Sequence, residues 1–114
     1  MLETSVLTQT PRLSTRPVAV LEVVGEIDVS SADRLDAAVR DVKNLGSPFV
    51  VDLCAVTFID SSGIRVLLRN HDEGGFVIAR AVTGNVARVL QIVGLEKVLD
   101  IFDDRETALM ALVD

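Results

Sequence analysis

The sequence predicts an α/β domain whose sheet is largely parallel. After the first strand segments, apolar strand segments alternate with helical segments, and short connections of this kind join parallel strands through right-handed crossovers. The hydrophobic residues make up 49% of the chain and include no Trp or Tyr, a composition typical of a buried sheet rich in aliphatic side chains. With 114 residues the chain has the size of one domain, which we expect to span residues 1–114.

The strand segments are recognised by their β-branched and apolar runs. Val6–Thr10 predicts a short edge strand, and a polar turn with two prolines follows from Pro11 to Pro17. Val18–Val24 is almost continuously apolar, which predicts a central strand, and Gly25 is expected to break it. Three further strands are predicted at Phe49–Leu53, Phe76–Ala79 and Val98–Phe102.

The first two helices have clear boundaries. Ser30 or Ser31 is expected to cap the first one, Gly46 and Pro48 close it, and its inner face repeats at helical spacing, with Leu35, Ala38, Val39, Val42 and Leu45. The second helix begins after Ser61 and ends at Gly74-Gly75, with Ile64, Leu67 and Leu68 on one face.

Two more helices are predicted in the last third of the chain. Residues 84–93 form a helix with Val86, Val89, Leu90 and Val93 facing inward, and Gly94-Leu95 has the pattern of a helix C-terminus with a left-handed glycine. Asp103 to Glu106 resembles a capping box in which Asp takes the place of Ser or Thr. The helix that follows has an inner face of Ala108, Leu109 and Leu112.

Charge and reactive side chains exclude several functions. The net charge is −6 and the Lys and Arg residues are scattered, so nucleic acid would be repelled. Cys54 is the only cysteine and cannot form an internal disulfide, and with His71 as the single histidine no metal set exists around it. No Ser-His-Asp set can be assembled around Ser61 from the sequence. We expect a small semi-buried Cys54 and a His71 that interacts with free carbonyls at a helix C-terminus. No signal peptide or membrane span is recognised, which predicts a cytoplasmic protein. No Gly-x-x-x-x-Gly-Lys-Ser/Thr loop or Gly-x-Gly-x-x-Gly turn is present, so no cofactor is expected.

The most informative segment runs from Val56 to Leu68. In it, Asp60-Ser61-Ser62-Gly63 stands directly before an apolar-periodic helix. Hydroxyl and carboxylate groups therefore lie at a helix N-terminus, where free N–H groups and the helix dipole favour negative charge. Two interpretations remain open: an ordinary helix cap, or a serine that is phosphorylated.

Three blocks in order give the chain a family resemblance. The Asp60–Ile64 block resembles the Asp-Ser-Ser/Thr-Gly-Leu/Ile motif of STAS domains in anti-sigma factor antagonists. Gly25-Glu26-Ile27-Asp28 is similar to the family's Gly-Glu-Leu/Ile-Asp, and Val86–Leu95 to its late helix ending in Gly-Leu. The resemblance spans nearly the whole chain and implies a mixed sheet of four or five strands with about four helices packed against it.

The resemblance also implies a function and its residues. The unphosphorylated antagonist would bind an anti-sigma factor that is also a serine kinase and so free the sigma factor; phosphorylation of Ser61 would break the complex, and a phosphatase would reset it. Asp60 would cap the helix or orient the loop, and Ser62 would be structural. Gly63 would permit close backbone approach, either inside the fold or to the kinase.

Two further residues have open assignments. Arg65 departs from a common family pattern with a small residue there, and it lines one helix stripe with Ser61 and Arg69; it is either solvated or touches the partner or the phosphate. Asp28 is either a turn residue before a helix or part of the partner surface.

Two other classes of function compete with the antagonist. STAS domains also occur as scaffolds or accessory subunits of stress-sensing and lipid-transport complexes, where the Asp-Ser-Ser/Thr-Gly pattern is often altered, so the intact motif favours the antagonist. An enzyme would need a catalytic constellation that this sequence does not contain.

Overall fold

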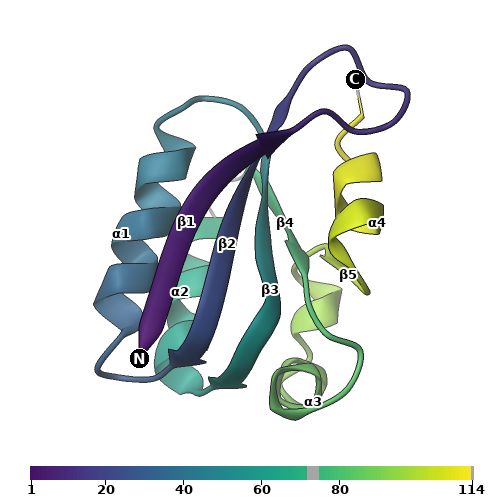
Figure 1. Ribbon diagram of the computed structural model, residues 1–114. Coiled ribbons are helices and arrows are strands. Elements are labelled where there is room, and N and C mark those ends of the chain that lie inside the picture. The colour runs from purple at the N-terminus through teal and green to yellow at the C-terminus, as the bar shows by residue number, and fades with distance from the viewer. Residues whose placement is uncertain (72–74, 114) are drawn as a thin grey trace.

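The computed structural model describes residues 1–71 and 75–113, in which five strands form one sheet in the order β1-β2-β3-β4-β5 (Figure 1). β1 pairs antiparallel with β2, and every later pair is parallel. The expected mixed, largely parallel sheet is therefore confirmed. The strands are β1 (Leu2–Gln9), β2 (Val18–Ile27), β3 (Phe49–Ile59), β4 (Phe76–Ala79) and β5 (Ile101–Phe102).

Helices cover the two faces of the sheet unequally. They are α1 (Ala32–Lys43), α2 (Ser61–His71), α3 (Asn85–Ile92), the short 3₁₀ helix η1 (Leu95–Lys97) and α4 (Arg105–Met110). In Figure 1, α1 lies to the left of the sheet and α2 lies partly behind β1 and β2, whereas α4 lies on the right beside β4 and β5. The predicted α/β architecture with four α-helices is confirmed for the described residues.

Side chains alternate between two cores along the strands, as the pleat requires. In β3, Val51 and Leu53 point into a large core that includes side chains of α1, α2 and α3. Val50, directly before Val51, points into a small core on the other face, which Leu109 of α4 completes. The six residues of α4 cover only part of that face, so the sheet beyond it is open to solvent.

An ion pair fixes α4 to this second face. The Arg105 Nε donates a hydrogen bond to Asp52 Oδ2 at 2.6 Å, and its terminal nitrogen pairs with Glu22. Asp52 is buried, and Glu22 lies directly opposite it on β2. Burial alone would lower the pKa of Arg105, but the hydrogen bonds to Asp52 and Glu22 outweigh burial and raise it.

The predicted ends of β2 and β3 were wrong. β2 continues through Gly25 to Ile27, and β3 continues past Leu53 to Ile59. Gly25 has φ +113°, and a Cβ there would lie 2.0 Å from the Met1 carbonyl oxygen, so the glycine permits the close approach of β1 and does not end the strand. β1 itself begins at Leu2, earlier than the predicted Val6–Thr10.

Four other local predictions needed correction. Leu45 lies beyond the end of α1 and Val93 beyond the end of α3, so both are exposed instead of facing the core. Val98 is 56% exposed because η1 occupies the chain before it, and the last strand is only Ile101–Phe102. The α4 cap is Asp104, which accepts a hydrogen bond from Thr107 N at 2.7 Å, and no Asp103–Glu106 box forms.

Candidate partner-binding site at the serine loop

The Asp28 and Asp60 loops lie side by side at one edge of the sheet. β2 and β3 are parallel and Ile27 pairs with Ile59, so their carboxyl ends meet at this edge. The Asp60 N–H donates to the Ile27 carbonyl oxygen at 3.2 Å, which joins the two loops directly. In Figure 1 both arrowheads point to the lower edge, where α2 begins.

The serine loop is a hydrogen-bonded helix cap that leaves one hydroxyl without a partner among the described residues. The Asp60 carboxylate accepts hydrogen bonds from Ser62 N at 2.9 Å and from the Ser62 hydroxyl, and the Asp60 carbonyl accepts from Ile64 N at 3.1 Å. Asp60 therefore caps α2, and Ser62 is held in its first turn. Ser61 is exposed as the first residue of α2, and its hydroxyl has no partner among the described residues. Of the two hydroxyls, only that of Ser61 has no hydrogen-bond partner among the described residues.

Gly63 is required by packing within the fold. The residue is buried, and a Cβ there would lie 2.5 Å from Ile27 Cγ2 and 2.7 Å from Ile59 Cγ1. Any side chain would push the first turn of α2 away from the ends of β2 and β3. Of the two alternatives for Gly63, the structure shows close approach inside the domain.

Asp28 organises the neighbouring turn. Its Oδ1 accepts hydrogen bonds from the Ser30 N–H at 2.9 Å and the Ser30 hydroxyl at 2.6 Å. These bonds lower the pKa of Asp28, although desolvation opposes them, so the carboxylate carries a negative charge near neutral pH. Ser31 occupies the N-cap position of α1, but its hydroxyl donates to the Glu26 carbonyl at 2.9 Å and accepts from Asp28 N at 3.0 Å. Asp28 is thus a turn residue that also lies at the candidate surface.

A third loop joins this edge through Asn85, which the sequence interpretation missed. The Asn85 Oδ1 accepts a hydrogen bond from Ile59 N at 2.9 Å. The contact ties the start of α3 to the end of β3, directly before the serine loop. Its signal in the sequence was an Asn at the start of a helix after Gly84, which only the tertiary structure connects to β3.

Arg65 and Arg69 both project from the exposed side of α2. Arg65 makes no ion pair among the described residues, whereas Arg69 lies 3.1 Å from Asp36 Oδ1 on α1. Asp36 also accepts from Asn70 Nδ2 at 2.8 Å and pairs with Arg40 at 2.9 Å. Burial would raise the pKa of Asp36, but the bonds from Asn70 and Arg69 and the charge of Arg40 outweigh it and lower the pKa.

The described residues offer Ser61 no catalytic partner. His71 is the last residue of α2, ten residues and about 15 Å from Ser61 along the helix axis, and its ring meets Phe76 edge-on at 5.4 Å. Cys54 is half-buried as expected, and burial followed by its proximity to Asp52 raises the pKa of its thiol to about 12, so it is not a thiolate nucleophile.

Within the described ranges no group of three His, Cys, Asp or Glu side chains could hold a metal ion, and no helix is long and apolar enough to cross a membrane.

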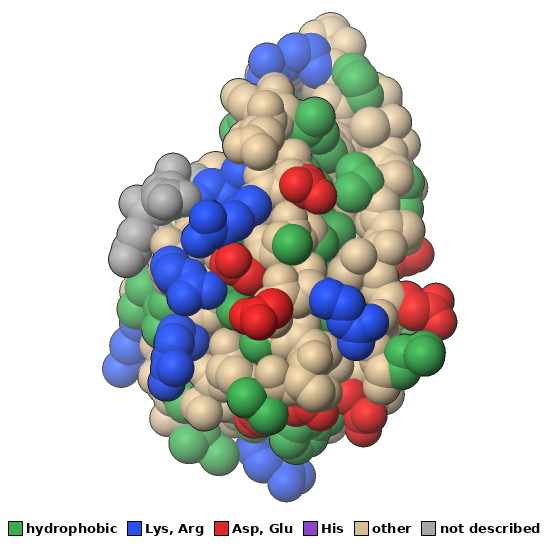
Figure 2. Space-filling view, turned by 90° about the vertical axis from the view of Figure 1, so that its left-hand side faces the viewer, with side chains coloured by type: hydrophobic (Ala, Val, Ile, Leu, Met, Phe, Trp, Pro, Cys, Tyr) green, Lys and Arg blue, Asp and Glu red, His purple; other side chains and the backbone are tan. Residues whose placement is uncertain are grey.

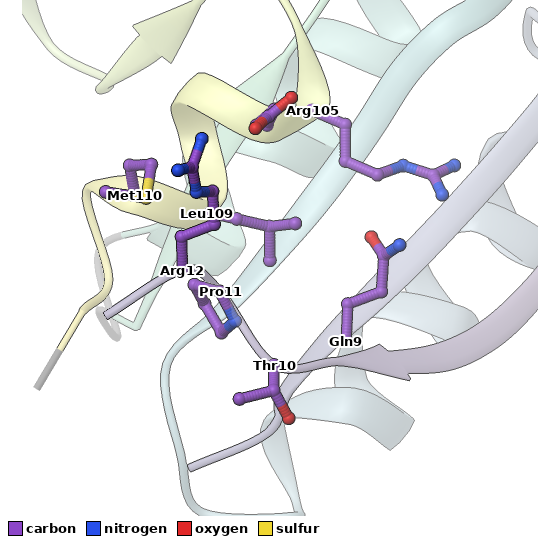
Figure 3. A pocket seen from close by; sticks show the side chains of 8 residues that line it. Gln9, Thr10, Pro11, Arg12, Arg105, Leu109 and Met110 are labelled. Atoms are coloured by element: carbon purple, nitrogen blue, oxygen red, sulfur yellow. The ribbon is translucent and has the colours of Figure 1, made fainter. Parts of the chain in front are cut away.

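A pocket of about 350 Å³ lies at the opposite end of the sheet from the serine loop. It opens between the β1–β2 connection and α4, and Arg12, Arg105 and Leu109 are among its lining side chains (Figure 3). Gln9 in its wall pairs with Val18 at the start of β2, whereas the Asp28 and Asp60 loops follow the strand ends. The pocket is therefore not part of the candidate site.

Comparison with known proteins identifies the family. A family model for the STAS domain matches residues 9–108, and the chain belongs to this family. The chain is 33% identical over 96 residues to the anti-sigma-F factor antagonist RsfB of Mycobacterium tuberculosis, covering 81% of this chain and 79% of RsfB. It is 30% identical over 105 residues to an anti-sigma F factor antagonist of Paenibacillus polymyxa, covering 85% and 88% of the two chains. The crystal structure of an anti-sigma factor antagonist from Mycobacterium paratuberculosis aligns with a TM-score of 0.77 at 28% identity, over 96% of this chain and 94% of the other.

Proposed function

We propose that this protein is an anti-sigma factor antagonist controlled by phosphorylation of Ser61. The unphosphorylated form binds an anti-sigma factor that is also a serine kinase, and binding releases the sigma factor. Phosphorylation ends the interaction, and a phosphatase restores it. The names of the relatives support the general function, and the observation that carries the switch is the exposed, unbonded hydroxyl of Ser61 beside the anchored Asp60 and Ser62.

The placement of Ser61 suits a switch that changes binding without changing the fold. A phosphate adds about −1.5 to −2 charges and bulk at the surface. The first turn of α2 favours an anion through its free N–H groups and its dipole, so the domain should remain folded. A partner surface that packs closely against the same hydroxyl would be displaced.

The proposed partner surface comprises the serine loop and its neighbours. Asp28, Asp60, Ser61, Ser62 and Arg65 present polar atoms at one edge, and the buried Gly63 contributes by keeping the loop tight against the strands. ATP, metal and the base for phosphoryl transfer come from the partner, because such a step needs all three. The proposal includes a cytoplasmic location and involves neither nucleic acid nor a membrane.

Phosphorylation mapping tests the assignment of Ser61. The chain is incubated with a kinase-type anti-sigma factor and Mg-ATP, and intact mass and phosphopeptides are measured. We expect one added phosphate on wild type and on Ser62→Ala, and none on Ser61→Ala, because Asp60 holds the Ser62 hydroxyl. A phosphate on Ser62, or one retained by Ser61→Ala, would refute the assignment.

A further inference from the structure

Four cations gather on the surface that α1 and α2 share. Arg69 of α2 and Arg40 of α1 both pair with Asp36. Lys43 Nζ of α1 donates a hydrogen bond to the Asn70 carbonyl oxygen of α2 at 3.2 Å, so cations of the two helices lie at the contact between them. Figure 2 shows a column of Lys and Arg side chains on the side of the molecule that carries α1. We call this group the basic stripe; it consists of Arg40, Lys43, Arg65 and Arg69.

The basic stripe is positive although the chain is acidic overall. It holds four of the eleven Lys and Arg residues of a chain with net charge −6, and within the described ranges Asp36 is the acid that pairs with Arg40 and Arg69. Two other acids project from α1: Asp33, two turns before Arg40, bounds the stripe at that end, and Asp41 points about 100° away from Arg40. Among the described residues, the three guanidinium groups of Arg40, Arg65 and Arg69 surround or flank one central acid, which leaves a local excess of positive charge.

The stripe is continuous with the proposed switch. Ser61, Arg65 and Arg69 are spaced four residues apart on α2, so they follow one side of the helix from the serine loop toward the stripe. All three are exposed. A partner that covers Ser61 and extends along α2 must therefore meet these guanidinium groups.

Building on the proposed function, we propose that the basic stripe is a second docking surface for an acidic face of the anti-sigma factor. The complementary charges steer the two proteins together in the orientation that brings the partner onto Ser61. Such complementarity acts mainly on the association rate and depends strongly on salt. Phosphorylated Ser61 would place its negative charge beside this stripe, in competition with the acidic face of the partner.

The test compares two triple variants with equal change in net charge. Arg40→Gln/Arg65→Gln/Arg69→Gln neutralises the stripe, and Arg12→Gln/Arg88→Gln/Lys97→Gln neutralises three exposed cations on other elements. The probe is the anti-sigma factor that phosphorylates Ser61 in the mapping experiment, and its association rate is measured by stopped flow at low and high salt. Arg65→Glu alone serves as a second stripe variant, because Arg65 makes no ion pair in the described ranges that its loss would break.

We expect the stripe variant to associate about tenfold more slowly than wild type at low salt, and this difference to vanish in about 1 M salt. At low salt, the association rate of the matched control should differ from that of wild type by less than half as much as the rate of the stripe variant does. Equal association rates for the two triple variants, or no slowing by Arg65→Glu, would overturn the docking role of the basic stripe. The proposed function would still stand in that case if Ser61→Asp bound the anti-sigma factor more weakly than wild type. Equal binding of wild type and Ser61→Asp would refute the switch instead, and no binding by wild type would overturn both.

Discussion

At the scale of single residues, the serine loop separates two adjacent hydroxyls by their hydrogen bonds. Asp60 holds Ser62, and Ser61 is left to solvent at the start of α2. The same carboxylate therefore acts as a helix cap and holds the Ser62 hydroxyl, so that Ser61 is the serine of the pair without a partner among the described residues. The structure thus shows an ordinary helix cap at Asp60, and the proposed modification site is the neighbouring residue Ser61.

Gly63→Ala should destabilise the domain through the ends of β2 and β3. The new methyl group would lie 2.5 Å from Ile27 Cγ2 in a buried position, and overpacking of this kind typically costs about 1–3 kcal/mol. Urea unfolding measures the loss, with the exposed Ser61→Ala as a control from the same turn. Unchanged stability of Gly63→Ala would show that the loop can move away from the strands without cost.

At the scale of elements, the sequence predicted the type and order of most helices and strands because their patterns are local. The end of β2 was missed because Gly25 was expected to break the strand, whereas the strand continues through it to Ile27. The end of β3 was missed because its exposed residues, Ala55, Thr57 and Phe58, do not alternate regularly with buried ones. The pairing of β2 with β3 nevertheless continues to Ile27 and Ile59, with register shifts that only the structure reveals.

The candidate site was predictable to a similar extent. Asp60, Ser61 and Gly63 form a local motif, and their roles as cap, exposed serine and tight glycine follow from its position before a helix. The contacts of Asn85 with Ile59 and of Asp36 with Arg69 join segments more than 20 residues apart. No local pattern encodes such contacts, so they required the structure.

The attachment of α4 gives a prediction at this scale. Arg105→Ala should destabilise the protein by about 3 kcal/mol, because it leaves the buried Asp52 carboxylate unpaired. Asp52→Asn/Arg105→Ala should cost less than Arg105→Ala alone, since the uncompensated charge is then absent. Thermal and urea unfolding of both variants measure the order. A double variant less stable than the single one would mean that packing, and not charge, holds α4.

At the scale of the whole molecule, the functional groups are segregated. The serine loop, the Asp28 turn and Asn85 lie at the carboxyl edge of the sheet, the basic stripe extends from there along α1 and α2, and α4 closes the second face elsewhere. This separation explains how a charge could be added at Ser61 without disturbing either core. It also means that changes at α4 and at the serine loop should affect stability and binding independently.

The most direct test of the central claim is calorimetry of the anti-sigma factor with three forms of this protein: unmodified, phosphorylated at Ser61, and Ser61→Asp. We predict tight binding by the unmodified form, loss of at least tenfold in affinity on phosphorylation, and a smaller loss in Ser61→Asp, which carries less charge. Melting temperatures should stay within a few degrees, because an anion at the start of α2 is tolerated or stabilises by about 0.3–1 kcal/mol. Equal affinity of the unmodified and phosphorylated forms would contradict the account.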